Sequence, residues 1–306
     1  MSALGFDTSN YTTSVAWFGN EQEKSQRRIL PVKPGERGLR QSDAVFSHMK
    51  ALPELFELLM AELLEKKISA IGVSTRPRSV EGSYMPVFLA GEGFARVTAA
   101  TLGVPLYRFS HQDGHLMAGI YSGSFYDLLE GEFLSVHLSG GTTEILKCAY
   151  CGNGFSAEIL GGTKDISAGQ LIDRIGVQLG LQFPCGRALE TLADKTQECI
   201  KVPVSTDGCF MNLSGLENKF SAMITNREKS IIARSVFEAV AKSLANTVRA
   251  AVAQTDSKRV LIVGGVASNA IIRSYLEQNV EAELFFAKPE YATDNAVGIA
   301  ALAERI

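Results

Sequence analysis

Two segments of one design, near the start and near the middle of the chain, most constrain how it can fold. In each, a short apolar strand runs into a polar turn and a second strand follows at once. The first joins residues 4–7 to residues 13–18, and the second joins residues 133–138 to residues 143–148. Short apolar runs bounded by such turns are typical of paired strands. The pair predicts a structural duplication, although the sequence shows no internal repeat.

The remainder of the chain alternates between helical and strand-like patterns. Residues 21–40 are polar and locally basic, which indicates either a solvated loop or a patch that faces phosphate; the basic residues are Lys24, Arg27, Arg28, Lys33, Arg37 and Arg40. Helices are expected over residues 45–66, 88–102, 166–179, 188–195, 228–254, 269–278 and 295–305, and further strands over residues 70–74, 104–107, 260–263 and 283–286.

Composition limits the class of protein. A chain of 306 residues is long enough for two domains. The net charge of −3 argues against a dedicated nucleic-acid binder, so any contact with RNA is expected to be local or shared with a partner. The chain contains no apolar run of about 20 residues, so no membrane span is expected. The first residues lack a signal-peptide pattern, and the five cysteines are an odd number, so we expect a cytoplasmic protein with reduced thiols.

Two cysteines, Cys148 and Cys151, have the spacing of zinc ligands. No second pair completes a four-ligand site, so two thiols at a strand end are the favoured interpretation.

Two histidines, His111 and His115, stand four residues apart. On a helix such residues share one face, and imidazole nitrogens bind Zn, Fe and Ni. A surface pair or a buried structural pair explains the same spacing. Asp294, which precedes the last expected helix, is a candidate third ligand. The alternative is that Thr293 or Asp294 caps that helix.

Three turns at strand ends have the composition of phosphate-binding turns. They begin at Asp7-Thr8-Ser9, at Ser139-Gly140-Gly141-Thr142 and at Gly264-Gly265. Glycine allows the backbone to approach a phosphate, and consecutive N–H groups then form an anion site. Each turn alone has a plainer explanation, a tight turn that needs positive φ. Their order at three strand ends favours phosphate binding.

These segments together resemble the tRNA threonylcarbamoyladenosine transferase (TsaD) family, once described as glycoproteases of peptidase family M22. The similarity covers nearly the whole chain in order. It rests on residues 5–9, 110–115, 139–143, 165–173, 184–186, 212–216, 264–269 and 293–295.

The resemblance implies the ASKHA fold of actin, Hsp70 and sugar kinases, with two similar α/β domains and a nucleotide cleft. We expect a first domain over residues 1–112, to which a C-terminal helix at 295–306 returns. The second domain is expected over residues 113–294, with a helical insertion at about 162–225. The implied reaction transfers a threonylcarbamoyl group from threonylcarbamoyl-adenylate to N6 of adenosine 37 of tRNA.

The resemblance also implies ligands and partners. One divalent metal, Fe or Zn, would be bound by His111, His115 and Asp294. Asp173 and Gly186 would meet the ribose-bearing part of ATP or the acyl-adenylate, and Asn269 its adenine side. A surface charge paired with Arg174 or Arg187 is the alternative for Asp173. The implied partners are tRNA, an adenine nucleotide, and an ASKHA-fold protein or a second copy of the chain. The remaining substrate-binding residues are Thr8, Ser9, His137, Leu138, Ser139, Gly140, Gly141, Gly264 and Gly265.

Several positions depart from the family pattern. Asn10, Tyr11 and Thr12 stand where the family usually carries an acidic pair, and Thr142 stands where it has histidine. A Gly-Pro-Gly loop is replaced by a segment with Arg76 and Arg78, and a Pro-Gly-Gly-Pro turn by one with Cys185 and Arg187. No catalytic residue is assigned from the sequence.

The sequence is compatible with three functions. The first is the transferase; the second is a divergent paralogue that binds or slowly hydrolyses ATP, or serves as a partner subunit, without modifying tRNA. The third, a metalloprotease, is disfavoured because the His111–His115 motif lacks the helical glutamate of the HExxH proteases.

Overall fold

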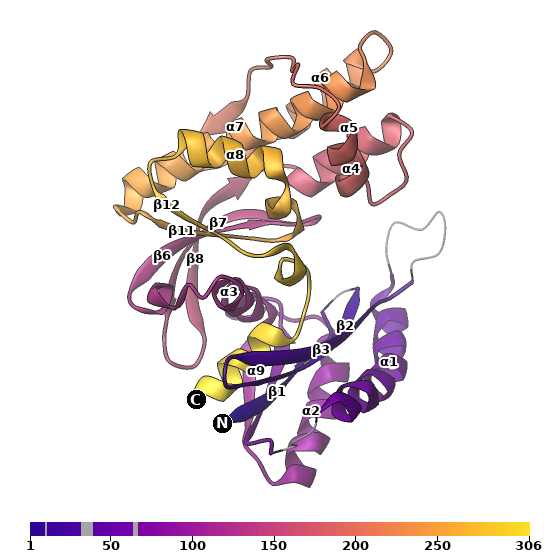
Figure 1. The fold of residues 1–306 in the computed structure, drawn as a ribbon, viewed down its shortest axis with the longest axis vertical. Helices are drawn as coiled ribbons and strands as arrows, with labels where there is room; N and C mark the ends of the chain where they lie inside the picture. Colours follow the sequence, from indigo (N-terminus) through magenta and orange to yellow (C-terminus); the bar gives the residue numbers. More distant parts are fainter. Residues whose placement is uncertain (10, 32–38, 64–66) are drawn as a thin grey trace. The chain divides into compact units, whose positions relative to one another are not determined.

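The computed structural model describes residues 1–9, 11–31, 39–63 and 67–306. The chain divides into two compact units, and each is described by itself (Figure 1). Unit 1 comprises Met1–Glu130, Ala149–Ser156 and Glu290–Ile306, and unit 2 comprises Gly131–Cys148 and Ala157–Pro289. The basic residues Lys33 and Arg37, the departure at Asn10 and the expected helix end at 64–66 lie outside the described residues.

Unit 1 is built on a five-stranded sheet with the order β3-β2-β1-β4-β5. Strands β1, β2 and β3 form an antiparallel meander, whereas β4 and β5 run parallel to β1. The elements are β1 (Ser2–Asp7), β2 (Thr12–Gly19), β3 (Gln22–Ile29), α1 (Gln41–Glu62), β4 (Ala70–Arg76), α2 (Phe88–Leu102), β5 (Leu106–Ser110), α3 (His111–Ser122), η1 (Tyr126–Leu129), η3 (Pro289–Tyr291) and α9 (Val297–Arg305).

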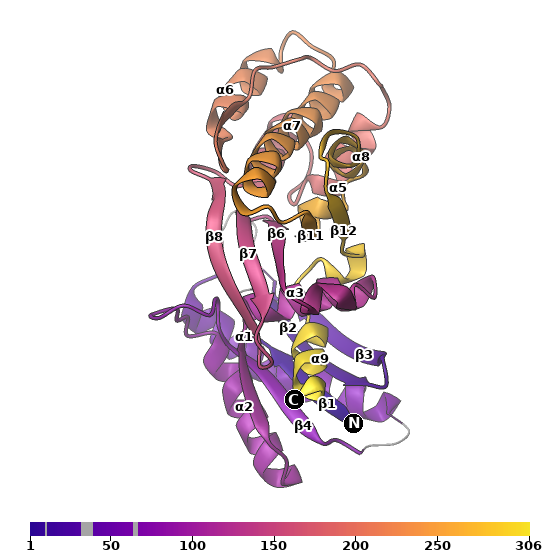
Figure 2. The same cartoon turned by 90° about the vertical axis from the view of Figure 1, so that its left-hand side faces the viewer.

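The two faces of this sheet are covered differently because side chains alternate along a strand. Leu4 and Phe6 of β1 share a core with the apolar residues of α1 and α2. Gly5, between them, faces α9, and a Cβ placed on it would lie 2.4 Å from the carbonyl oxygen of Ala296. Glycine is therefore required there for the close approach of α9 to the sheet, which Figure 2 shows beside β1.

Unit 2 is built on a seven-stranded sheet with the order β12-β11-β6-β7-β8-β10-β9. The pairs β6–β11 and β11–β12 are parallel. The elements are β6 (Glu132–Leu138), β7 (Thr143–Tyr150), β8 (Phe155–Thr163), α4 (Ala168–Gln178), α5 (Gly186–Ala193), β9 (Ser205–Asp207), β10 (Phe210–Asn212), α6 (Ser214–Met223), α7 (Lys229–Thr255), β11 (Arg259–Val263), η2 (Gly265–Ser268), α8 (Ala270–Asn279) and β12 (Glu283–Phe286).

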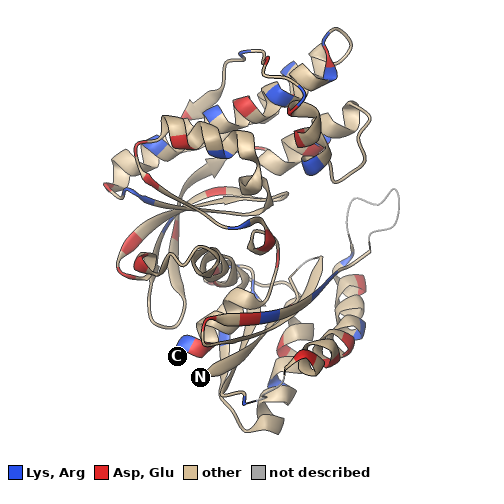
Figure 3. Ribbon diagram, in the orientation of Figure 1, with Lys and Arg blue, Asp and Glu red and all other residues tan. Residues whose placement is uncertain are grey.

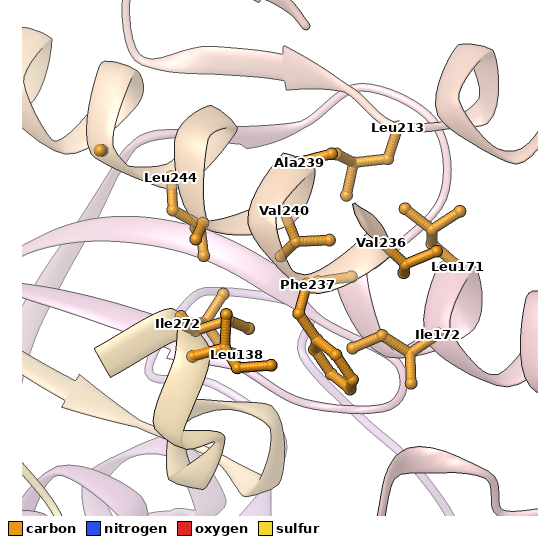
Figure 4. Close-up of a cluster of buried hydrophobic side chains, with 14 of the residues drawn as sticks. Leu138, Leu171, Ile172, Leu213, Val236, Phe237, Ala239, Val240, Leu244 and Ile272 are labelled. Atoms are coloured by element: carbon orange, nitrogen blue, oxygen red, sulfur yellow. The ribbon is translucent and has the colours of Figure 1, made fainter. Parts of the chain in front are cut away.

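The core of unit 2 lies between the sheet and its helices. Phe237 and Val240 of the long helix α7 pack with Leu138 of β6, Ile172 of α4 and Ile272 of α8 (Figure 4). This core continues from Leu138 to the polar turn that follows β6, so the turn rests on a well-packed base.

The predicted duplication is confirmed by the strand order. Strands β3-β2-β1-β4-β5 of unit 1 correspond to β8-β7-β6-β11-β12 of unit 2, and the parallel pairs fall at the same places. Strands β10 and β9 extend the second sheet beyond β8. The architecture is that of the ASKHA fold.

Two expectations differ from the structure. Residues 22–29, interpreted as part of a polar loop, form strand β3, whose side chains are mostly exposed. The expected boundary at residue 112 falls inside unit 1, which continues to Glu130 because α3 packs on α9. Gly114 and Gly298 allow that contact, since a Cβ on Gly298 would lie 1.9 Å from the Gly114 carbonyl oxygen.

No helix in the described part of the chain is long and apolar enough to cross a membrane.

Candidate metal centre and nucleotide-binding turns

The two histidines are presented by a short, firmly capped helix. Strand β5 ends at Ser110 and α3 begins at the next residue. The Ser110 hydroxyl accepts a hydrogen bond from the Asp113 N–H, and the Asp113 carboxylate accepts one from the Ser110 N–H at 2.8 Å. This reciprocal cap satisfies the first backbone donors of the helix and fixes its start. His111 and His115 therefore lie one turn apart on the same face.

Asp294, the candidate third ligand, lies beside the two histidines. The Nε2 atoms of His111 and His115 lie 2.9 Å apart, and Asp294 Oδ1 lies 3.5 Å from the first and 3.3 Å from the second. Within the described residues this is the cluster of three histidine, cysteine or acidic side chains whose ligand atoms converge, all within 4.8 Å of one another. The structure thus brings together residues that are separated by 179 positions in the chain, from residue 115 to residue 294.

A fourth residue, Asp7, contacts the ring nitrogen of His111 that faces away from the cluster. Its carboxylate lies 3.2 Å from Nδ1 of His111 and accepts hydrogen bonds from the hydroxyls of Ser9, at 2.8 Å, and Ser74. Asp7 is fully buried at the end of β1. A carboxylate on one imidazole nitrogen sets the tautomer so that the other nitrogen faces the ligand. The sequence placed Asp7 in a candidate phosphate-binding turn, and its contact with His111 was not predicted.

The electrostatics of the cluster favour positive charge. Burial by itself disfavours the charged form of His111, but the carboxylates of Asp7 and Asp294 outweigh it and raise the pKa of His111 from 6.5 to about 10. Burial would raise the pKa of Asp294, yet hydrogen bonds with His111 and His115 hold it well below 3.8. The two carboxylates therefore stabilise a protonated His111. They would also stabilise a metal cation bound to His111 instead of that proton.

The donor set fits a divalent transition metal. Two neutral imidazoles and one carboxylate form a common site for Fe or Zn, and such a set leaves coordination positions open for substrate. The pair of facing Nε2 atoms needs a proton or a cation between them, because two lone pairs at this distance repel. His111, His115 and Asp294 are therefore chemically suited to a resident metal ion.

Thr8 and Ser9 are engaged within unit 1. The Thr8 hydroxyl donates to the Val87 carbonyl at 2.9 Å and accepts from the Gly91 N–H at 3.2 Å, which joins β1 to the start of α2. The Ser9 hydroxyl donates to Asp7. Both hydroxyls thus organise the end of β1.

In unit 2, the turn after β6 exposes two backbone donors. The Ser139 N–H donates to the Thr142 carbonyl at 2.8 Å, and the Thr142 N–H donates to the Ser139 hydroxyl at 3.0 Å. Among the described residues, the N–H groups of Gly140 and Gly141 have no hydrogen-bond partner, and a Cβ on either would meet open space. Two consecutive unpaired donors on an open turn are an arrangement that suits an anion, so the turn remains a candidate phosphate-binding site. The partly buried His137 precedes this turn on β6.

The turn after β11 lies against the same strand. Gly264 has φ of +100°, and a Cβ on it would lie 2.2 Å from the Leu138 carbonyl oxygen. Gly265, in contrast, faces open space. Asn269 caps α8 by accepting from the Ile272 N–H at 3.0 Å, while its buried Nδ2 has no partner among the described residues. An unsatisfied buried donor is costly, so this amide is suited to donate a hydrogen bond to a ligand atom.

Asp173 and Gly186 are also close to one another. Asp173 accepts a hydrogen bond from the Cys185 N–H at 2.7 Å, and burial raises its pKa. Arg174 pairs instead with Glu217, at 3.0 Å. Gly186 opens α5 and faces open space. Glu190, one turn further on, accepts from the Ala270 N–H at 2.8 Å and ties α5 to α8, a contact that no sequence motif indicated.

Two further features have structural explanations. Asp165 accepts from the N–H groups of Leu213 and Ser214 and from the Ser214 hydroxyl, and these contacts lower its pKa to about 2 despite partial burial. Cys148 is buried and Cys151 is exposed, and neither is in a disulfide.

Two of the basic residues expected on a phosphate-facing patch, Arg27 and Arg28, have protein partners. Arg28 pairs with Glu54 of α1 at 2.7 Å, and Arg27 donates to the Thr293 hydroxyl at 2.7 Å. Figure 3 shows acidic and basic residues together on β3.

Comparison with known proteins decides the family. The family model TsaD, tRNA N6-adenosine threonylcarbamoyltransferase, matches residues 28–301. The chain belongs to this family. A tRNA N6-adenosine threonylcarbamoyltransferase of Thermus thermophilus is 32% identical over 312 residues, covering 100% of this chain and 93% of the relative. One from Neorickettsia sennetsu is 29% identical over 311 residues, covering 97% of this chain and 91% of the relative.

Solved structures show the same fold at low identity. HypF of T. kodakarensis superposes with a TM-score of 0.65 at 15% identity, and the chain spans 46% of the length of that protein. A ROK family glucokinase from Streptomyces griseus, solved with glucose and AMPPNP, gives 0.57 at 12% identity with full coverage of both chains. These likenesses support the ASKHA architecture of the TsaD-family chain.

Proposed function

We propose that this chain transfers a threonylcarbamoyl group from threonylcarbamoyl-adenylate to N6 of adenosine 37 of tRNA, in a metal-dependent reaction in the cytoplasm. The observation that carries the proposal is the convergence of His111, His115 and Asp294, with Asp7 behind His111. It occurs in a chain whose relatives along nearly the whole length bear the name of this transferase.

Each group has a role that its contacts support. His111, His115 and Asp294 bind the metal, and Asp7 keeps the proton of His111 on Nδ1. When bound, the metal supplies Lewis acidity at the carbonyl of the threonylcarbamoyl group. The Gly140 and Gly141 N–H groups donate to the phosphate or to developing negative charge. Asp173, beside Gly186, accepts from ribose hydroxyls with the oxygen that Cys185 leaves free, and the Asn269 amide donates at the adenine side.

A second function is favoured by one observation. The position where the family has a histidine carries Thr142, whose backbone closes the Ser139–Thr142 turn and whose side chain carries no titratable group. Tyr11 similarly stands in the segment where the family has an acidic pair. A paralogue that binds or hydrolyses ATP, or pairs with another ASKHA-fold protein or a second copy, would retain the nucleotide-binding turns without transfer.

One experiment separates the two. Purified chain is supplied with metal, threonylcarbamoyl-adenylate from an adenylate-forming enzyme, and a tRNA with adenosine 37; modified nucleoside is measured after digestion. The transferase function predicts modified adenosine, its loss in His111→Ala, and none on a tRNA with guanosine at position 37. Nucleotide binding measured by calorimetry, with no modified nucleoside even when the partner proteins of a standard system are added, contradicts transfer and supports the paralogue.

A further inference from the structure

The segment that presents Asp294 has little regular structure of its own. It runs from the single turn η3 through residues 292–296 to the start of α9. Asn295 organises it from inside, since its Nδ2 donates to the carbonyls of Tyr291, at 3.2 Å, and Thr293, at 2.7 Å. The Ala296 N–H donates to the Ser14 hydroxyl at 2.9 Å, which anchors the end of the segment to β2. The position of Asp294 within it therefore depends on what fixes the preceding residues.

Strand β3 supplies those contacts. Arg27 Nη1 donates to the Thr293 hydroxyl at 2.7 Å and to the Glu290 carbonyl at 3.3 Å. Glu23, four residues earlier, accepts from the Tyr291 hydroxyl at 3.1 Å. The Tyr291 ring also packs edge-on against Tyr121 of α3, with centroids 5.6 Å apart.

Side chains on the two faces of β3 contact different parts of unit 1. Glu23 and Arg27 reach residues 290–293, whereas Gln26 and Arg28 reach Glu62 and Glu54 of α1. Successive residues of a strand point to opposite faces, so one row of β3 serves the helix and the other serves the Asp294 segment. The two arginines are adjacent, exposed and similarly bonded to oxygen, yet only Arg27 contacts the segment.

We propose that Arg27, through the Thr293 hydroxyl, is a positioning residue for the metal ligand Asp294. The inference rests on the proposed metal site and adds a residue to it that touches neither metal nor substrate. A guanidinium hydrogen bond is charge-assisted and directional, so it restrains the residue next to the ligand. Without it, Asp294 must be ordered when the metal binds, and the ordering cost lowers affinity.

Zn²⁺ affinity of the purified full-length chain tests the proposal. The protein is stripped with a chelator and titrated with Zn²⁺ against a chromophoric competitor, and the thermal midpoint of each metal-free variant is recorded. Arg27→Ala and Thr293→Val should each weaken Zn²⁺ binding about tenfold, the lower end for residues that orient metal ligands. Arg28→Ala loses a comparable surface contact and should stay within about twofold of wild type, as should Thr293→Ser, which keeps the hydroxyl.

The double variant distinguishes a shared action from two separate ones. If Arg27 acts through Thr293, Arg27→Ala adds less than about threefold in a Thr293→Val background. Full additivity, wild-type affinity in Arg27→Ala, or equal weakening in Arg28→Ala overturns the proposal. If Arg27→Ala does not fold, the comparison of Thr293→Val with Thr293→Ser decides: equal affinities overturn it. Failure of the metal site itself is recognised separately, because wild type and His111→Ala would then bind Zn²⁺ alike.

Discussion

Asp7→Asn is the most direct perturbation of the metal centre, because it removes a charge without removing volume. The Asn carbonyl can still accept from the Ser74 hydroxyl and His111 Nδ1, and its amide can donate to the Ser9 hydroxyl in place of the present bond to Asp7. The geometry is therefore retained, while the negative charge 3.2 Å from His111 Nδ1 is lost.

The substitution should lower metal affinity, because Asp7 holds a histidine of the proposed metal site. Losing such a partner of a metal ligand weakens metal binding by about 10- to 100-fold, which corresponds to roughly 1.4–2.7 kcal/mol. The full burial of Asp7 and its direct contact with a ligand imidazole place the expectation toward the upper end of this range. Competition titration with a chromophoric chelator measures it.

A matched substitution separates this effect from a general loss of a structural carboxylate. Asp165→Asn changes a residue of unit 2 that also accepts several hydrogen bonds but lies outside the metal cluster. It should leave metal affinity unchanged. Unaltered affinity in Asp7→Asn, with affinity lost in His111→Ala, would refute the argument that Asp7 tunes the ligand.

Further predictions concern pH, turn geometry and the nucleotide. The raised pKa of His111 stabilises the metal-free fold below pH 6.5, and this contribution is lost as pH rises toward about 10; urea unfolding should show the decline, and His111→Ala should flatten it. Metal affinity should rise over the same range, since the ion displaces that proton. Gly264→Ala, with φ of +100° and a Cβ 2.2 Å from the Leu138 carbonyl oxygen, should destabilise unit 2 by about 2 kcal/mol or more. Gly140→Ala, which meets open space, should change the free energy of unfolding by less than about 0.5 kcal/mol yet weaken nucleotide binding in calorimetry. Asp173→Ala should weaken adenine-nucleotide binding by roughly 1–3 kcal/mol, and unchanged affinity would leave Asp173 with only its contact to Cys185.

The sequence alone determined those features that local chemistry encodes. The strand–turn–strand pairs predicted the duplication because turn residues and apolar runs are short-range signals. The i,i+4 spacing of His111 and His115 predicted their common face for the same reason. The glycine-rich turn after residue 138 predicted open backbone donors, which Gly140 and Gly141 supply.

Elements with weak local signals were missed. Strand β3 was interpreted as a loop because its edge position leaves mostly exposed, polar side chains with no apolar alternation. The boundary after residue 112 was misplaced since no linker marks it; residues 113–130 join unit 1 through the close packing of α3 on α9, which depends on Gly114 and Gly298.

Only the tertiary structure decided which distant side chains share an environment. The sequence left Asp294 open as a third ligand or a helix cap, because it stands 179 positions after His115. Asp7, Glu190 and Arg27 gave no distinctive pattern, since a buried strand-end acid, a helical glutamate and an edge-strand arginine each occur in many structural roles. Their roles arise from the pairing of β1 with β4, the packing of α5 near α8, and the passage of residues 290–296 along β3. These are long-range contacts, and no short segment of sequence records them.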